Sequence, residues 1–236
     1  MQLTVRKSNG EVKTLDWHWL QPEQIDEMMA LEDRVVESTQ DPSLYRRESA
    51  DTILASMKDG AGCIGGFVDG QLIAVRYVSY PSDYDLSEGI IEKENSRQVL
   101  HMETMIVDPD FRGNALQVKS FYYLLAHLPR EVEFLFSTVS PFNLPSLKSV
   151  FKYGSRMVDL RLMYPTDEEP EGVLRYIGAR GLVLDLAEER TEAALDDIET
   201  QQALFRDGQV ATGLKDDETV VFQKVIRSAV PLNKKK

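Results

Sequence analysis

A glycine turn between an apolar strand and an apolar helix constrains the fold of this chain more than any other feature. Residues 101–107, HMETMIV, have the methionine-rich and β-branched composition of a buried strand, and residues 114–128 have the apolar spacing of a helix. Arg112 and Gly113 stand between them. A strand that turns through glycine into a helix leaves backbone N–H groups pointing out of the helix start, where an anion binds favourably. The junction predicts an anion site or, as the plainer alternative, a turn without a ligand.

The rest of the chain alternates predicted helices and strands around one core. Residues 21–40 have the spacing of a long amphipathic helix, and Asp69-Gly70 joins two apolar runs as in a tight hairpin. From residue 186 the composition is acidic, which predicts a helix over 186–205 and an appendage over 186–236. The remaining predicted elements are strands at 2–9, 11–17, 63–68, 71–80, 133–140, 156–164, 173–184 and 219–226, a helix at 49–58, and a loop with a short helix at 141–154.

The formal net charge of −12 narrows the classes of partner. Nucleic acids and anionic membranes bind proteins largely through Lys and Arg, so neither is expected, whereas a cationic substrate fits. The alternative is that the acidic surface only provides solubility. With three histidines and a single cysteine, the chain has no metal-ligand spacing and no intrachain disulfide, so no metal is expected. The chain shows neither a long apolar run nor a signal-peptide pattern, and the expected location is cytoplasmic.

Two segments match the signatures of a known family. VDPDFRGNALQ, residues 107–117, resembles the acyl-CoA-binding signature of the GNAT superfamily of N-acetyltransferases, in which a strand ending in Val-x-Pro precedes an Arg/Gln-x-x-Gly-x-Gly/Ala turn. NLPSLKSVFKYG, residues 143–154, resembles the second signature, and the resemblance covers residues ~20–165. The matching positions are Val107, Pro109, Phe111, Arg112 and Gly113 in the first signature, and Asn143, Ser146, Lys152 and Gly154 in the second.

This resemblance implies an α/β (α+β) fold with a mixed, mostly antiparallel sheet flanked by helices. Residues 1–185 are expected to form the acyl-CoA-binding and catalytic domain, and residues 186–236 a small appendage of helix plus strand. The implied function is transfer of an acetyl group from acetyl-CoA, the cosubstrate, to a primary amine acceptor in a direct ternary complex. A homodimer is one expected assembly. The alternatives are a non-catalytic acyl-CoA-binding or regulatory module, and an amine-binding or protein-interaction function in the appendage.

By the same resemblance, the strand and the turn bind the cosubstrate together. The main chain of residues 105–107 is expected to bind the pantetheine arm and to polarise the thioester carbonyl, which stabilises the oxyanion of acyl transfer. Residues 112–117 are expected to hold the diphosphate. The implied cofactor-binding residues are Met105, Ile106, Val107, Arg112, Gly113, Asn114, Ala115, Leu116 and Gln117 from the first signature, and Asn143, Ser146 and Lys152 from the second. A simple helix cap is the alternative role of Asn143.

Three positions depart from the family pattern. Ala115 stands where Gly is usual, so its methyl group is expected to hold the backbone slightly away from the diphosphate. Gln117 stands where Gly or Ala is usual. Val150 stands where many members carry the Tyr that protonates the leaving thiolate, and no other residue of this sequence is evident as the proton donor.

His101 and Glu103 are the two candidates for the general base. They lie two residues apart on one predicted strand, so their side chains are expected to share a face, and family members place the base at one or the other position. The alternative is a buried pair satisfied by hydrogen bonds.

The sequence does not identify the amine that accepts the acetyl group. By resemblance, its pocket is formed by residues 20–45, 81–98 and 160–180. Acidic residues in these segments would suit a polyamine, an aminoglycoside or a Lys side chain, although a solvated acidic surface explains them equally well. They are Asp26, Glu27, Asp83, Asp85, Glu88 and Glu92.

Overall fold

The structure, a computed structural model, describes residues 3–39, 46–82, 84–167 and 169–229; Asp83, one of the predicted acceptor residues, therefore lies outside the described residues. The chain divides into two compact units. The N-terminal unit contains residues 1–80 and 102–129, and the C-terminal unit contains residues 81–101 and 130–236. Within the described ranges, no helix is long and apolar enough to cross a membrane.

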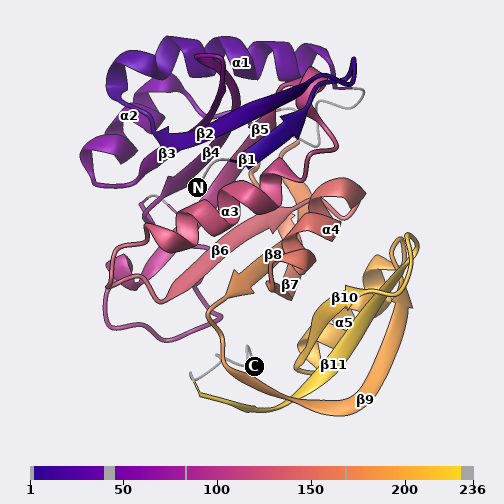
Figure 1. The fold of residues 1–236 in the computed structure, drawn as a ribbon. Coiled ribbons are helices and arrows are strands. Elements are labelled where there is room, and N and C mark those ends of the chain that lie inside the picture. Colours follow the sequence, from indigo (N-terminus) through magenta and orange to yellow (C-terminus); the bar gives the residue numbers. More distant parts are fainter. Residues whose placement is uncertain (1–2, 40–45, 83, 168, 230–236) are drawn as a thin grey trace. The chain divides into compact units, whose positions relative to one another are not determined.

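The N-terminal unit is built on the consecutive strands β1-β2-β3-β4-β5 (Figure 1). The pairs β1/β2, β2/β3 and β3/β4 are antiparallel. The elements are β1 (Leu3–Arg6), β2 (Val12–Trp19), α1 (Ile25–Glu37), α2 (Ala50–Lys58), β3 (Gly62–Val68), β4 (Gln71–Ser79), β5 (Val99–Val107, of which residues 102–107 belong to this unit) and α3 (Leu116–Ala126). The predicted helices at 21–40, 49–58 and 114–128 are confirmed within a few residues.

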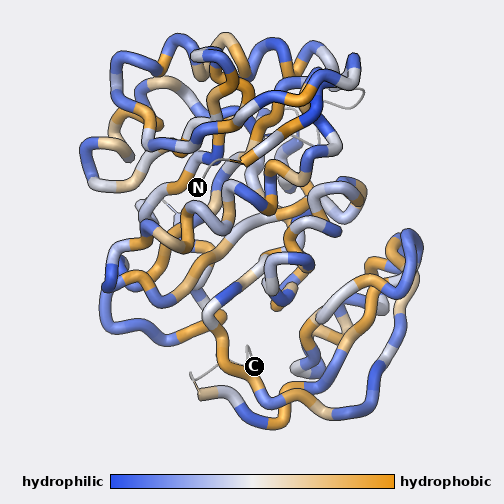
Figure 2. Tube along the Cα trace, viewed as in Figure 1, coloured by the Kyte–Doolittle hydropathy of each residue, from blue (hydrophilic) through white to orange (hydrophobic). Residues whose placement is uncertain are grey.

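Helices cover the two faces of these strands separately. Figure 2 shows hydrophobic and hydrophilic residues alternating along α1, as its amphipathic spacing predicts. One apolar core joins α1 and α2 to β4, and another joins the start of α3 to β2 and β4. The first includes Met28, Leu31, Ile53, Val75 and Tyr77, and the second includes Leu15, Ile73, Ala74, Phe111 and Leu116.

The hairpin predicted at Asp69-Gly70 is confirmed. Both residues have positive φ, 51° and 81°, as a two-residue hairpin turn requires. The flanking strand β3 is glycine-rich because it lies close to its neighbours: a Cβ atom added to Gly65 would come within 2.4 Å of Leu20 Cδ2. The glycines of this strand therefore serve tight packing.

The C-terminal unit contains the strand order β6-β8-β7-β10-β11-β9. Its pairs β6/β8, β7/β8, β7/β10, β10/β11 and β9/β11 are antiparallel. The elements are β6 (Phe134–Val139), α4 (Leu144–Lys152), β7 (Arg156–Met163), β8 (Val173–Arg180), β9 (Leu184–Ala194), α5 (Ile198–Arg206), β10 (Gln209–Leu214) and β11 (Thr219–Ser228). Short 3-10 turns occur in the two units, at Pro22–Gln24, Ser96–Gln98 and Pro109–Phe111.

The predicted fold class, a mixed α/β protein with a mostly antiparallel sheet flanked by helices, is confirmed.

The prediction of one acidic helix over residues 186–205 is wrong in its first half. Residues 184–194 form the strand β9, which Figure 2 draws largely in hydrophilic colours, and only α5 is helical. The Ala, Glu and Leu content favours a helix locally. Pairing with β11 overrides that preference, because β9 runs antiparallel to β11 from Ala194 opposite Thr219 to Leu184 opposite Ser228.

The segment after residue 185 is attached to β8 by a buried polar side chain. Gln201 of α5 is fully buried; its Oε1 accepts a hydrogen bond from the hydroxyl of Tyr176, and its Nε2 donates to the carbonyl of Ala194 at 2.7 Å. The ring of Phe205 lies between Tyr176 and Phe222, with centroid distances of 6.3 and 5.2 Å. The segment thus contributes side chains to the core of the C-terminal unit.

Candidate functional site

The turn between β5 and α3 combines a capped 3-10 turn with two residues of positive φ. Asp108 caps the 3-10 turn by accepting a hydrogen bond from the N–H of Asp110 at 3.0 Å. Gly113 and Ala115 then have positive φ, 81° and 54°, and α3 begins at Leu116. A left-handed residue followed by a right-handed one, as at Ala115 and Leu116, is a backbone arrangement in which neighbouring N–H groups can bind one anion. The helix start adds a partial positive charge at the same end.

Ala115 begins α3 in a conformation that disfavours any side chain. Its φ and ψ of 54° and 33° are left-handed, and its carbonyl accepts from the N–H groups of Val118 and Lys119, both at 3.0 Å. A left-handed residue other than glycine costs about 1–2 kcal/mol. The departure from glycine at this position therefore strains the backbone of the turn itself.

Two side chains of the first signature make contacts within the N-terminal unit. The Asn114 carboxamide accepts from the N–H of Arg6 and donates to its carbonyl, both at 2.7 Å, so it binds the β1 strand like a neighbouring strand. Arg112 donates through Nη2 to Ser38 Oγ at 2.8 Å, at the end of α1.

The middle of β5 is irregular. Glu103 accepts a hydrogen bond from Ser79 Oγ at 2.6 Å, whereas Met105 Sδ accepts one from Ser120 Oγ of α3 at 3.4 Å. Ser79 shares a face of β4 with Tyr77, which belongs to the core under α1 and α2, so the two contacts lie on opposite faces. Residues two apart in a regular strand share a face, so the alternation breaks here, as it often does beside active sites. Residues 103–105 are also partly exposed, between buried neighbours.

Glu103 lies in an electronegative environment that sequence reasoning missed. Burial raises the pKa of Tyr77 to about 12, with further upward contributions from the charges of Glu103 and Glu48. Burial also raises the pKa of Glu48, against the lowering effect of the Arg46 guanidinium 3.1 Å away. Two carboxylates therefore act on the same tyrosine, one from β5 and one from the segment before α2. Glu48 carries no local sequence signal, because it precedes a helix in an ordinary polar stretch.

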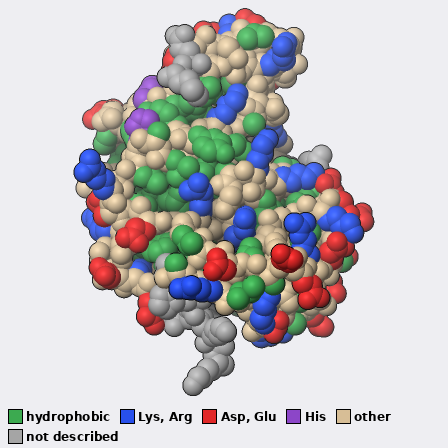
Figure 3. All heavy atoms as spheres, turned by 60° about the horizontal axis from the view of Figure 1, so that its bottom comes forward, with side chains coloured by type: hydrophobic (Ala, Val, Ile, Leu, Met, Phe, Trp, Pro, Cys, Tyr) green, Lys and Arg blue, Asp and Glu red, His purple; other side chains and the backbone are tan. Residues whose placement is uncertain are grey.

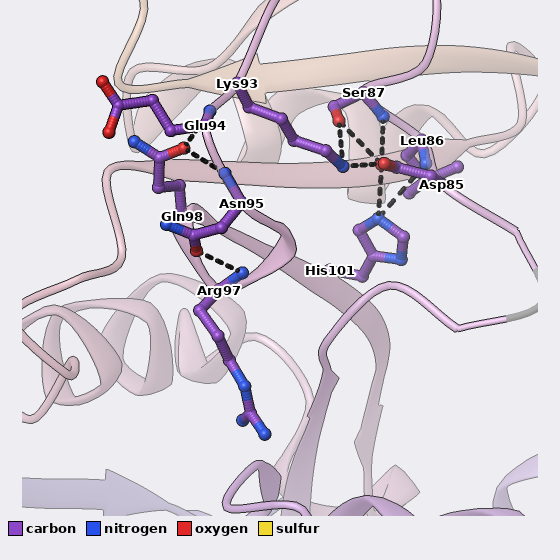
Figure 4. A network of polar contacts seen from close by, with 9 residues as sticks. All are labelled: Asp85, Leu86, Ser87, Lys93, Glu94, Asn95, Arg97, Gln98 and His101. Carbon is purple, nitrogen blue, oxygen red and sulfur yellow. Dashed lines mark hydrogen bonds and ion pairs between the residues drawn. The ribbon is translucent and has the colours of Figure 1, made fainter.

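His101 lies in a different environment from Glu103. It is buried, its ring stacks on Tyr84 at 5.4 Å, and Nε2 accepts the backbone N–H of Leu86 at 3.2 Å (Figure 4). The Asp85 carboxylate lies 3.6 Å from the same nitrogen and is also bonded by Lys93. The ring nitrogen that a base would use is engaged by a main-chain donor, so His101 orders residues 84–87.

The second signature opens the helix α4. Asn143 Oδ1 accepts the N–H of Ser146 at 3.2 Å, which is a helix cap, the alternative role considered above. Val150 is 1% exposed and fills the core beneath α4, and Lys152 is exposed at the end of the helix. The predicted cofactor-binding roles of Asn143, Ser146 and Lys152 stay predictions.

A buried arginine lies under the first turn of α3. Arg76 of β4 is 2% exposed and donates to the carbonyl of Gln117 at 2.6 Å and to Ser120 Oγ at 3.0 Å. The sequence holds a signal for it, since a single arginine interrupts the apolar run LIAVRYVSY. Among the described residues, no group of three or more His, Cys, Asp or Glu side chains is placed to hold a metal ion.

No family model matches the chain, and no curated protein matches it in sequence. Solved structures match its fold. A ribosomal-protein-alanine N-acetyltransferase from Brucella melitensis has a TM-score of 0.55 and 12% identity, over 70% of this chain and 98% of that one. An acetyltransferase of the GNAT family from Streptococcus pneumoniae has a TM-score of 0.53 and 14% identity over the same shares, 70% and 98%. This chain has the GNAT fold.

The GNAT fold leaves the reaction open. GphF, a GNAT-like decarboxylase in complex with isobutyryl-CoA, matches this chain with a TM-score of 0.53 and 17% identity, over 70% of this chain and 98% of its own. Structures with the same fold thus include N-acetyltransferases and a decarboxylase. The fold alone therefore does not specify the reaction, which depends on the residues of the site.

Proposed function

We propose that this GNAT-fold chain is an N-acetyltransferase that moves an acetyl group from acetyl-CoA to a primary amine by direct transfer. The observation that carries the proposal is the turn over residues 112–117. This turn lies between β5 and α3, and its residues Gly113 and Ala115 are left-handed. Its backbone donors suit the diphosphate of CoA. Arg112 adds a guanidinium beside the turn.

The irregular part of β5 supports the acyl-transfer chemistry. The main chain of residues 105–107 runs toward the turn and is the proposed binding site of the pantetheine arm. A backbone N–H donor there polarises the thioester carbonyl and stabilises the oxyanion that forms when the amine attacks, usually a large part of acyl-transfer catalysis.

Glu103 is the proposed general base. The cationic amine first gives one proton to Glu103, and the lone pair that this frees on nitrogen attacks the thioester carbonyl carbon. The C–S bond then breaks to release the CoA thiolate, and the attacking nitrogen loses its second proton to solvent. Ser79 holds the carboxylate by its hydrogen bond at 2.6 Å. Val150 offers no proton to the thiolate, so the thiolate takes one from solvent.

The acceptor is proposed to be cationic before it loses its proton. Acidic and basic side chains are interspersed on the face drawn in Figure 3, so the net charge alone marks no acceptor site there. A local feature supports a cationic acceptor: besides burial, the charges of Glu103 and Glu48 both contribute to the raised pKa of Tyr77. An ammonium group offsets the mutual repulsion of two such carboxylates.

The test of this function combines binding and turnover. Calorimetry with CoA and acetyl-CoA is expected to show binding, and a panel of polyamines, aminoglycosides and lysine peptides is expected to contain an amine that releases CoA from acetyl-CoA. No binding at millimolar ligand would remove the proposal. Binding without turnover of any amine would favour the alternative, a non-catalytic acyl-CoA-binding module, which Val150 and the strained Ala115 also support.

A further inference from the structure

Arg76 places a charged group inside the N-terminal unit, on the side of β4 that faces α3. An arginine side chain stays protonated in proteins, so its 2% exposure means that a full positive charge is buried. Burying a cation is costly unless the structure uses it in hydrogen bonds and in favourable fields.

The guanidinium binds the first turn of α3. Nη2 donates to the carbonyl of Gln117 at 2.6 Å, and Nε donates to Ser120 Oγ at 3.0 Å. Ser120 Oγ in turn lies 3.1 Å from the same carbonyl and 3.4 Å from Met105 Sδ. Arg76 therefore connects β4 with the helix turn that carries the backbone donors, and through Ser120 with the irregular part of β5.

The position and the positive charge of Arg76 both favour binding of an anion at the turn over residues 112–117. A charge in the low-dielectric interior is less screened than one at the surface, so it acts over a longer distance. The carbonyl that it binds belongs to Gln117, the last residue of the turn over residues 112–117. The exposed Arg112 is screened by solvent, whereas Arg76 is held in one place.

We infer that Arg76 is a positioning residue for the turn over residues 112–117, the proposed diphosphate-binding site, called the cradle below. Arg76 holds the cradle in place through its hydrogen bonds to α3, and its permanent positive charge favours an anion there. The inference rests on the proposed function, because the ligand is the CoA that the turn is proposed to bind. Arg76 acts through the α3 turn and does not touch the ligand.

The test compares two variants by calorimetry with CoA and with inorganic diphosphate. Arg76→Gln keeps an N–H donor for the Gln117 carbonyl but removes the charge, and Arg76→Lys keeps the charge but loses the forked geometry. We expect Arg76→Gln to weaken CoA at least tenfold and diphosphate in parallel, and Arg76→Lys to weaken CoA less than threefold. Arg175→Gln, which alters a buried arginine of β8, is the matched control and is expected to leave CoA affinity unchanged.

The outcomes separate the inference from the proposed function. If the wild-type protein binds neither CoA nor diphosphate, the proposed function fails. If it binds CoA and a folded Arg76→Gln variant binds equally well, or if the Gln and Lys variants lose affinity equally, the inference is overturned. Should Arg76→Gln not fold, the Lys variant decides, because a tenfold loss of CoA affinity at an unchanged melting temperature would show that the charge does not support the cradle.

Discussion

Ala115 carries the left-handed conformation that begins α3, and a single methyl group sets its cost. We expect Ala115→Gly to raise the free energy of unfolding by about 1 kcal/mol, since the strain removed is about 1–2 kcal/mol. The greater chain entropy of glycine in the unfolded state returns about 0.4–1 kcal/mol of that gain. Urea unfolding measures the stability, and calorimetry measures CoA affinity, which is expected to tighten or to hold.

Gly113→Ala is the matched control for this prediction. A Cβ atom at Gly113 meets nothing within 4 Å, so only the φ of 81° opposes it. It should therefore lower stability by about 1–2 kcal/mol. An Ala115→Gly variant that is folded but binds CoA more weakly would show that the turn has adapted to alanine.

Glu103 and His101 differ in what surrounds them, so their variants should differ in kind. We expect Glu103→Gln to lower the maximal rate by on the order of 10²-fold, because it removes the base without changing the shape of the side chain. His101→Gln should chiefly lower stability, because it disturbs the bond from Leu86. Steady-state kinetics across pH, with a melting curve for each variant, make the distinction.

Ser79→Ala is the control for Glu103, since it removes the hydrogen bond and leaves the carboxylate. Its effect on the rate should be smaller than that of Glu103→Gln. The reverse pattern, in which His101→Gln slows a folded enzyme and flattens the acid limb of the pH–rate profile, would identify His101 as the base.

At the scale of the element, α4 depends on its first residue. Asn143→Ala should lower stability by about 1 kcal/mol, because the cap to the N–H of Ser146 is lost. Asn143→Asp keeps the capping oxygen and should keep stability. If the amide also binds CoA, as the resemblance implies, the Asp variant loses CoA affinity while its unfolding curve stays in place; equal affinity in the Asp variant and the wild type leaves Asn143 as a cap alone.

The irregularity of β5 has a consequence at the same scale. A regular strand would place Glu103 and Met105 on one face, so the base would lie under α3 with the methionine. The break in alternation sends the carboxylate to the face of Tyr77 and keeps the methionine against Ser120. The strand β5 therefore holds the proposed base on one face and contacts α3, the helix that follows the turn over residues 112–117, on the other.

At the scale of the whole molecule, the segment after residue 185 is predicted from sequence to be an appendage, and that boundary stays a prediction. Gln201 makes the segment testable. Gln201→Leu should lower the free energy of unfolding by about 1–3 kcal/mol, because it leaves the buried hydroxyl of Tyr176 without its acceptor. Chemical denaturation measures the loss, and CoA affinity should be unchanged.

Tyr176→Phe completes a double-mutant cycle with this variant. The pair Tyr176→Phe and Gln201→Leu should be more stable than Gln201→Leu alone, since no unpaired hydroxyl then remains. Additive effects would contradict the coupling. A truncated chain of residues 1–185 that folds and binds CoA like the full chain would support an independent boundary instead.

Local signals determined much of this protein from its sequence. The hairpin at Asp69-Gly70, the helix α1 and the junction of β5 with α3 depend on turn geometry and on apolar spacing within a few residues, so the sequence predicts each of them. The turn over residues 112–117 is only partly of this class: Gly113 permits the positive φ found there, whereas the left-handed conformation of Ala115 runs against its residue type.

Only the tertiary structure decided the remainder. Residues 184–194 become β9 because β11 lies beside them, although their composition favours a helix. The charge of Glu48 contributes to the raised pKa of Tyr77, and Arg76 donates a hydrogen bond to the carbonyl of Gln117. In both pairs the two residues are distant in sequence. Such features depend on which segments meet in the folded chain, and local propensity is too weak to specify those meetings, because long-range pairing and burial outweigh it.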